Sequence, residues 1–184
     1  MEREEGELNT WTFGGVTPEV AIKGFGGATL LSAQPNKTWE FLEKVMGLDF
    51  IGKEEDFARY RSSADIGNII DLKLTPIGRG QMGVGTVHHI AWRAKDDQDQ
   101  MDWKRFVERN GYGVTPVRDR NYFNAIYFRE HGEILFEIVT DPPGFAHDET
   151  HATMGEKLML LSQYEPHRGQ IERALFPFEV RELN

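Results

Sequence analysis

The chain has 184 residues, of which 39% are hydrophobic and 28% are charged, and its formal net charge is −9. This length is enough for one domain with a real hydrophobic core. The acidic balance argues against a nucleic-acid partner, because phosphate binding needs clustered lysine and arginine. The absence of cysteine excludes disulfides and thiolate metal sites.

Membrane spans and export signals are not expected. No apolar run reaches the roughly 20 residues that a membrane helix needs. The first residues, Met1-Glu2-Arg3-Glu4-Glu5, are polar and acidic, which is unlike a secretory signal. We therefore expect a cytoplasmic protein with no membrane partner, and we interpret residues 1–21 as an N-terminal linker or tail.

A first β-α-β-β-β module is predicted over residues 22–76. The helix is expected to start at Pro35 and to stop at Gly47, a residue suited to a left-handed helix cap. Between them, apolar residues recur at three- and four-residue spacing, as on one face of a helix. The predicted strands cover residues 22–31, 48–51, 57–61 and 68–74.

A second module is predicted over residues 85–141, after a connector rich in glycine. Its helix is expected over residues 97–110, stopped by Gly111. Its strands are expected at residues 86–93, 114–117, 122–129 and 134–140. Beyond it, residues 142–184 are expected to form a C-terminal helical tail, with helices at 153–164 and 166–176.

The two modules keep a nearly constant offset along the chain. It is 62 residues from Gly27 to His89, 64 from Gly47 to Gly111, and 65 from Gly67 to Gly132. An offset this steady indicates an internal repeat. We predict an α+β fold in which two tandem βαβββ modules form paired twisted sheets around a cleft.

Two ionisable residues in the second module stand in apolar strand sequence. His89 precedes Ile90-Ala91-Trp92, and Glu137 lies within Leu135-Phe136-Glu137-Ile138. A buried ionisable group is costly unless a charge or hydrogen bond meets it. Imidazole and carboxylate with open coordination positions are typical ligands of non-haem Fe(II). Because neighbouring strand residues face opposite sides, His88 is expected to point away from this site.

These sequences resemble the vicinal oxygen chelate superfamily, which includes glyoxalase I, extradiol dioxygenases and fosfomycin resistance proteins. The segments Gly85–Trp92, Val114–Arg120, Tyr122–Glu130 and Leu135–Ile138 are most similar to the C-terminal half of bacterial ring-cleaving dioxygenases of the hydroquinone type. Those relatives are about twice as long, so the chain is expected to correspond to one half of them.

The resemblance implies roles for five residues. His89 and Glu137 would be ligands of a divalent metal, with Fe(II) expected and Mn, Ni or Zn as alternatives. Tyr127 would be a catalytic residue, and Arg120 and Arg129 would bind the substrate. The implied activity is extradiol-type cleavage of a small aromatic substrate related to catechol or hydroquinone.

The first module departs from the pattern, because Gly26 and Gly27 stand where a second histidine ligand would be. Asp71 lies near the matching carboxylate position, one place off the register of Glu137, and is a possible third ligand. Otherwise a homodimer or a separately encoded N-terminal half would complete the site. A glyoxalase-like isomerase and a non-catalytic binding module of the bleomycin-resistance type remain alternative functions.

Overall fold

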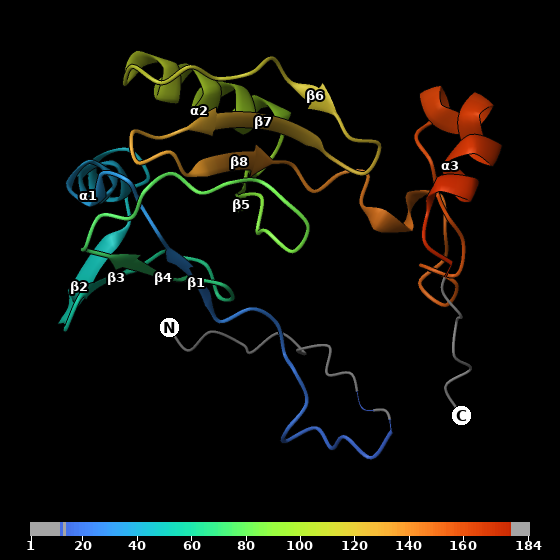
Figure 1. Cartoon of the computed structure of the whole chain (residues 1–184), viewed down its shortest axis with the longest axis horizontal. Coiled ribbons are helices and arrows are strands. Elements are labelled where there is room, and N and C mark those ends of the chain that lie inside the picture. Colours follow the sequence, from blue (N-terminus) through green and yellow to red (C-terminus); the bar gives the residue numbers. More distant parts are fainter. Residues whose placement is uncertain (1–11, 13, 178–184) are drawn as a thin grey trace.

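The computed structural model describes residue 12 and residues 14–177. Two four-stranded sheets, each with one long helix, form the body of the molecule (Figure 1). The first module contains β1 (Gly27–Leu30), α1 (Pro35–Lys44), β2 (Asp49–Glu54), β3 (Phe57–Arg61) and β4 (Ile69–Lys73). The second contains β5 (Ile90–Arg93), α2 (Asp97–Arg109), β6 (Arg118–Asp119), β7 (Asn124–Arg129) and β8 (Leu135–Val139).

The two sheets have the same topology. Their strand orders are β1-β4-β3-β2 and β5-β8-β7-β6. In each sheet the first strand runs parallel to the last, and the other pairs are antiparallel. The predicted α+β fold of two tandem βαβββ modules is therefore confirmed.

The helix boundaries follow from local chemistry. Pro35 starts α1, where its missing N–H leaves no hydrogen bond unmade. Gly47 ends the turn after α1 with a φ of 67°, and the N–H of Leu48 bonds back to the carbonyl of Leu42 at 2.9 Å. Asp96 caps α2 by accepting a hydrogen bond from the N–H of Asp99 at 2.8 Å.

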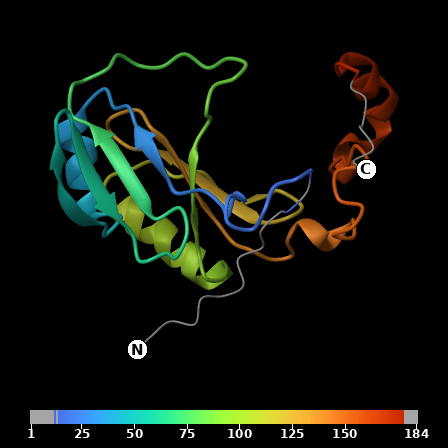
Figure 2. The same cartoon turned by 90° about the horizontal axis from the view of Figure 1, so that it is seen from below.

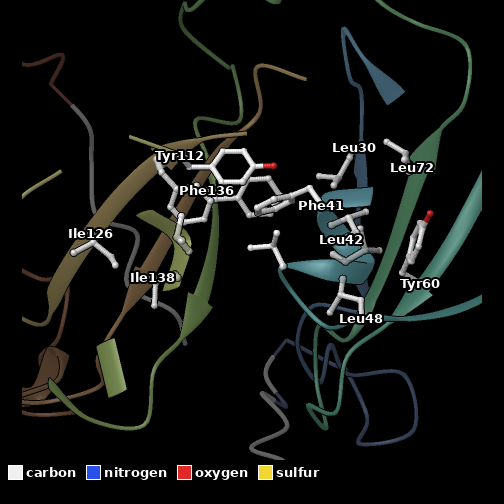
Figure 3. Packing of buried hydrophobic residues seen from close by; sticks show 14 of the residues in the cluster. Leu30, Phe41, Leu42, Leu48, Tyr60, Leu72, Tyr112, Ile126, Phe136 and Ile138 are labelled. Carbon is white, nitrogen blue, oxygen red and sulfur yellow. The ribbon is translucent and has the colours of Figure 1, made fainter. Parts of the chain in front are cut away.

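One hydrophobic core joins the two modules, and α1 lies between the sheets (Figure 3). The ring of Phe41 lies 5.1 Å from those of Tyr112 and Phe136, centre to centre. In β8, Phe136 and Ile138 point into this core. By strand alternation Glu137 points to the other face of the sheet, away from the shared core.

The predicted cleft between the modules is present as a cavity of about 680 Å³. Met46 and Leu48 line it from the first module, and Trp92, Trp103 and Ile138 from the second. Neither His89 nor Glu137 lines this cavity. The candidate metal ligands therefore lie outside this cavity.

A buried polar network also connects the modules. Glu130, which is 2% exposed, accepts hydrogen bonds from the Thr38 hydroxyl at 2.9 Å and from the N–H groups of Gly132 and Ile134. The Thr38 hydroxyl also lies 2.7 Å from that of Ser32. Every charged oxygen of Glu130 thus has a donor, which is what burial of a carboxylate requires.

The structure corrects three expectations about secondary structure. The first strands of both modules are shorter than predicted, so His88 and His89 precede β5 instead of lying in it. Residues 114–117 contribute a single bridge, from Val114 to Phe128, and no strand. Residues 153–161 form turns and irregular backbone where a helix was predicted.

The C-terminal segment contains two 3₁₀ helices, η1 (Phe145–His147) and η2 (Ser162–His167), followed by α3 (Arg168–Ala174). Figures 1 and 2 show it standing beside the two sheets. The predicted linker falls mostly outside the described residues, and residues 14–21 form turns without regular structure. No helix among the described residues has the length and apolar character to cross a bilayer.

Candidate metal and substrate site

Glu137 is the centre of the candidate site. It lies in the middle of β8, opposite Ala91 of β5 and Tyr127 of β7, and only 2% of the residue is exposed. Its Oε2 lies 2.6 Å from Nε2 of His89. Its Oε1 is buried and has no hydrogen-bond partner among the residues that the structure describes. A carboxylate oxygen left in this state is destabilising unless another group binds it.

His89 directly precedes β5, and its Nε2 lies 2.6 Å from Oε2 of Glu137 in the neighbouring strand β8. The prediction that His88 faces the opposite side is wrong. Nδ1 of His88 lies 2.8 Å from Nδ1 of His89. The two histidines precede the regular strand, where side-chain alternation no longer constrains their directions.

Tyr127 stands next to both candidate ligands. Its ring lies 5.9 Å from that of His89, centre to centre, in an edge-on arrangement. Burial raises the pKa of Tyr127 to about 12, and hydrogen bonding to Glu137 and the negative charge of that carboxylate add to the shift. The phenol therefore keeps its proton throughout the neutral range and can act as a hydrogen-bond donor.

The two arginines predicted to bind the substrate, Arg120 and Arg129, differ in their surroundings. The backbone N–H of Arg120 bonds to the carbonyl of Phe123, and the charge of Arg120 opposes the rise in the pKa of Tyr127. The side chain of Arg129 instead donates to the carbonyl of Glu133 at 2.8 Å, in the turn between β7 and β8. The structure thus associates Arg120 with the site and Arg129 with the turn.

Arg118 is a site neighbour that the sequence analysis missed. It pairs with Ala125 across β6 and β7, and Ala125 shares a sheet face with Tyr127. Its positive charge also opposes the rise in the pKa of Tyr127. The signal was available in the sequence, since Arg118 and Arg120 are separated by one residue, as two residues on one strand face are.

Asp71, the possible third ligand, lies in the other sheet and pairs with Arg59. In the first sheet, Asp71 pairs with Thr29 and Arg59. It therefore takes the position that Glu137 takes in the second sheet, and the predicted offset of one residue is absent. Arg59 donates two hydrogen bonds to the carboxylate of Asp71, of 2.8 and 2.7 Å. This pairing lowers the pKa of Asp71, and the carboxylate is already neutralised by its neighbour.

Gly27 is the counterpart of His89 in the first sheet. A Cβ added at Gly27 would lie 2.1 Å from the carbonyl oxygen of Ile69. No side chain fits there without movement of the backbone. The first module thus carries glycine, aspartate and arginine where the second carries histidine, glutamate and tyrosine, and only the second presents a histidine–carboxylate pair.

The donor set fits a divalent metal only in part. The pair of His89 and Glu137 offers one imidazole nitrogen and one orphaned carboxylate oxygen, which are ligands typical of Fe(II), Mn, Ni or Zn. Among the described residues, no group of three histidine, aspartate or glutamate side chains is arranged to hold a metal.

Comparison with known proteins identifies the family of the chain. Residues 24–146 match the family described as the glyoxalase/bleomycin resistance protein/dioxygenase superfamily. The chain is 79% identical over 184 residues to MhqO of Bacillus subtilis (strain 168), to which ring-cleaving dioxygenase activity is assigned provisionally. It is 27% identical over 176 residues to the chlorohydroquinone/hydroquinone 1,2-dioxygenase of Sphingobium indicum.

A crystal structure of a provisionally assigned dioxygenase from Bacillus subtilis superposes with a TM-score of 0.90 at 80% identity. It is matched by 98% of this chain, which covers 58% of that protein. The chain spans 59% of MhqO and 54% of the Sphingobium enzyme, while 100% and 93% of the chain is aligned. From the matched family and these relatives, we conclude that the chain belongs to the glyoxalase/bleomycin resistance protein/dioxygenase superfamily.

Proposed function

We propose that this chain carries the metal site of a ring-cleaving, extradiol-type dioxygenase that acts on catechol- or hydroquinone-like aromatic compounds. The observation that supports the proposal most directly is the state of Glu137. Its carboxylate is buried, touches His89 with one oxygen and leaves the other without a partner. A divalent cation would satisfy that oxygen, and Fe(II) suits the ring-cleaving chemistry of the relatives.

His89 and Glu137 would hold the metal through Nε2 and the carboxylate oxygens. When bound, the metal would supply a Lewis acid that polarises the hydroxyl oxygens of the substrate and a template that fixes the position of the ring. Apolar packing beneath β8, from Phe136 and Ile138, would keep the strand that carries Glu137 rigid. A rigid strand holds a side chain in place more closely than a loop would, and His89 directly precedes such a strand, β5.

Tyr127 would act as a hydrogen-bond donor to an oxygen of the substrate. Its raised pKa keeps the hydroxyl protonated at neutral pH, and its ring stands beside His89. Arg120 would attract and orient an acidic phenol, because it adds positive charge near the Tyr127 hydroxyl. Arg129 would contribute mainly to the β7–β8 turn, where its guanidinium is already bonded.

The remaining metal ligand would come from a partner. Two sources are compatible with the two-ligand site: a second copy of this chain, or a separately encoded N-terminal half. Twofold homodimers are the commonest soluble oligomers, and the relatives are longer than this chain. Sedimentation of the full chain with and without metal distinguishes them, since a homodimer predicts a doubled mass and a missing half predicts a monomer that binds metal weakly.

The metal is tested on the metal-free full chain. Anaerobic titration with Fe(II), Mn(II), Ni(II) and Zn(II), followed by elemental analysis, should give one ion per site, and His89→Ala should abolish it. His151→Ala is the matched control, because His151 is an exposed histidine of the C-terminal segment. Equal metal content in His89→Ala and the wild type would contradict the proposal.

The reaction is tested with the Fe(II)-loaded protein. Oxygen consumption with hydroquinone or catechol, accompanied by ring-cleaved product, is expected of a dioxygenase. Turnover of a glutathione hemithioacetal without oxygen consumption would indicate a glyoxalase-like isomerase instead. Tight binding of an aromatic compound with no turnover in the presence of a competent partner half would indicate a binding module.

A further inference from the structure

The cavity between the two modules has no part in the proposed reaction, because neither His89 nor Glu137 lines it. Its volume is about 680 Å³, and cavities of about 300–1,000 Å³ commonly hold one small organic molecule. Junctions between structural units are also a frequent place for such sites. The cavity is therefore a candidate site for a second ligand, separate from the proposed metal site.

The walls of the cavity come from both modules and are largely apolar. Met46 and Leu48, which follow α1, line it from the first module, and Trp103 of α2 and Ile138 of β8 line it from the second. Figure 3 shows Leu48 and Ile138 on the two sides of this junction. A ligand between these side chains would leave water on both sides, which favours a molecule with an apolar body.

Two tryptophans, Trp92 and Trp103, add aromatic surface to these walls. Phe136 stacks on one face of Trp92, with 6.0 Å between the ring centres and 6° between the planes, which leaves the opposite face for a further contact. Nε1 of Trp92 is buried, so the indole presents ring carbon and no N–H to the cavity. The face of an indole ring is electron-rich and attracts cations more strongly than that of any other aromatic side chain.

The charged side chains at the cavity are mainly acidic. Among the described residues that line it, three are charged, namely Asp65, Arg93 and Asp141. Nε of Arg93 lies 2.9 Å from Oδ1 of Asp141, so these two charges offset each other. Asp65, an exposed residue of the loop between β3 and β4, adds a further negative charge. The cavity is thus net acidic, in a chain whose formal net charge is −9.

We propose that this cavity binds a small organic cation, a substituted ammonium ion carried on an aromatic or other apolar body. The body would lie between the apolar side chains of the two modules, and the ammonium group would lie against the indole rings, within the field of Asp65. A neutral molecule of the same shape would gain only the apolar contacts, and an anion would be repelled. This inference goes beyond the proposed function and does not depend on it.

Three probes of nearly the same shape test the preference for positive charge. Trimethyl[4-(hydroxymethyl)phenyl]ammonium is the cation, 4-tert-butylbenzyl alcohol has carbon in place of its nitrogen, and 4-tert-butylbenzoate is the anion. Calorimetric titration of the chelator-treated full chain measures the dissociation constants. The cation should bind once per chain and about tenfold more tightly than the alcohol, a difference within the range of cation–π contacts. The benzoate should bind more weakly than both.

The contribution of Asp65 is tested with a variant that keeps the size of the side chain. Asp65→Asn should weaken binding of the cation by about two- to fivefold, as expected for an exposed ion pair, and leave binding of the alcohol unchanged. Asp56→Asn is the matched control, because Asp56 lies in the turn between β2 and β3 and does not line the cavity. It should bind the cation like the wild type.

The position of the bound cation is tested by ¹H–¹⁵N NMR of the indole N–H groups. The signals of Trp92 and Trp103 should shift on titration with the cation. The signal of Trp39 should not, because Trp39 packs beneath Lys53 and does not line the cavity. His89→Ala should bind the cation with unchanged affinity, since His89 lies outside the cavity.

Each result supports or overturns the inference. Failure of the cation to bind, or equal affinity for the cation and the alcohol, overturns it. Equal affinities of Asp65→Asn and Asp56→Asn for the cation overturn it too, because the charge at the cavity then has no role. Binding without shifts of Trp92 and Trp103, or loss of binding in His89→Ala, would place the ligand elsewhere. A failure of the metal site alone leaves all these measurements valid.

Discussion

The hydroxyl of buried Thr38 should contribute much more to stability than that of a surface threonine, because it joins the two modules at a buried carboxylate. It donates to Glu130 at 2.9 Å and lies 2.7 Å from the Ser32 hydroxyl, and all three residues are at most 2% exposed. Thr38→Val keeps the shape of the side chain and removes only this donor. Hydrogen bonds to charged groups contribute about 1.5–3 kcal/mol, so we expect the free energy of unfolding to fall by about 2–3 kcal/mol.

Thr75 provides a matched control. Its hydroxyl donates to the Asp56 carboxylate at the same distance of 2.9 Å, but in an exposed position. Thr75→Val should therefore change the free energy of unfolding by no more than about 0.5 kcal/mol. The comparison isolates burial, since the chemical groups and the substitution are the same in both variants.

The assay is urea denaturation followed by tryptophan fluorescence and circular dichroism. A lower midpoint with an unchanged slope is expected for Thr38→Val, because the surface exposed on unfolding does not change. In a thermal scan the midpoint should fall by roughly 5–10 °C for a chain of this size. Equal losses in the two variants, or a loss below about 0.5 kcal/mol in Thr38→Val, would refute the argument that burial of Glu130 makes this hydroxyl important.

Three further predictions concern the site. Glu137→Gln should remove bound metal yet leave the metal-free protein at least as stable, because it replaces a buried carboxylate that has an unpaired oxygen; unchanged metal content on elemental analysis would show that Glu137 is not a ligand. Asp71→Asn should keep full metal content, since Arg59 holds Asp71 in the other sheet, and a matching loss in both variants would contradict that separation. Between pH 10 and 12 the folded state keeps the proton of Tyr127 that the unfolded chain loses, because the folded pKa is about 12 and the ordinary value is 10. Stability should therefore decline as pH rises through this range, and less steeply in Tyr127→Phe; identical declines in chemical denaturation at pH 9 and 11 would count against the shift.

The sequence determined the architecture because both modules carry the same local signals, which are glycines at the helix ends and apolar residues at helical spacing. Glycines end both predicted helices, at Gly47 and Gly111, and both have positive φ angles in the structure. Apolar residues at helical spacing, among them Trp39 of α1 and Trp103 of α2, pack against the core. Such signals act over a few residues, so a single sequence can carry them. Strand ends are less well determined, because they depend on where pairing partners stop.

The sequence also pointed to His89 and Glu137, since a histidine and a glutamate among apolar strand residues require a local explanation. The sequence could not show which residue of the second module corresponds to Asp71. Counting from a glycine put Asp71 one residue out of register with Glu137, whereas strand pairing makes the two equivalent and places Arg59 beside Asp71. Register across strands is set by pairing and by turn length, which are properties of the folded sheet.

Only the tertiary structure decided where the candidate site faces and what surrounds it. The hydrophobic faces of both sheets meet around α1, so Glu137 is directed away from the cleft between the modules. The contact of His88 with His89 exists because the two residues precede the strand, where the rule of alternating directions no longer holds. The role of Glu130 depends on Thr38, 92 positions away. Neighbours brought together from distant parts of a chain by packing leave no periodic pattern in the sequence, which is the physical reason that these contacts could not be predicted from it.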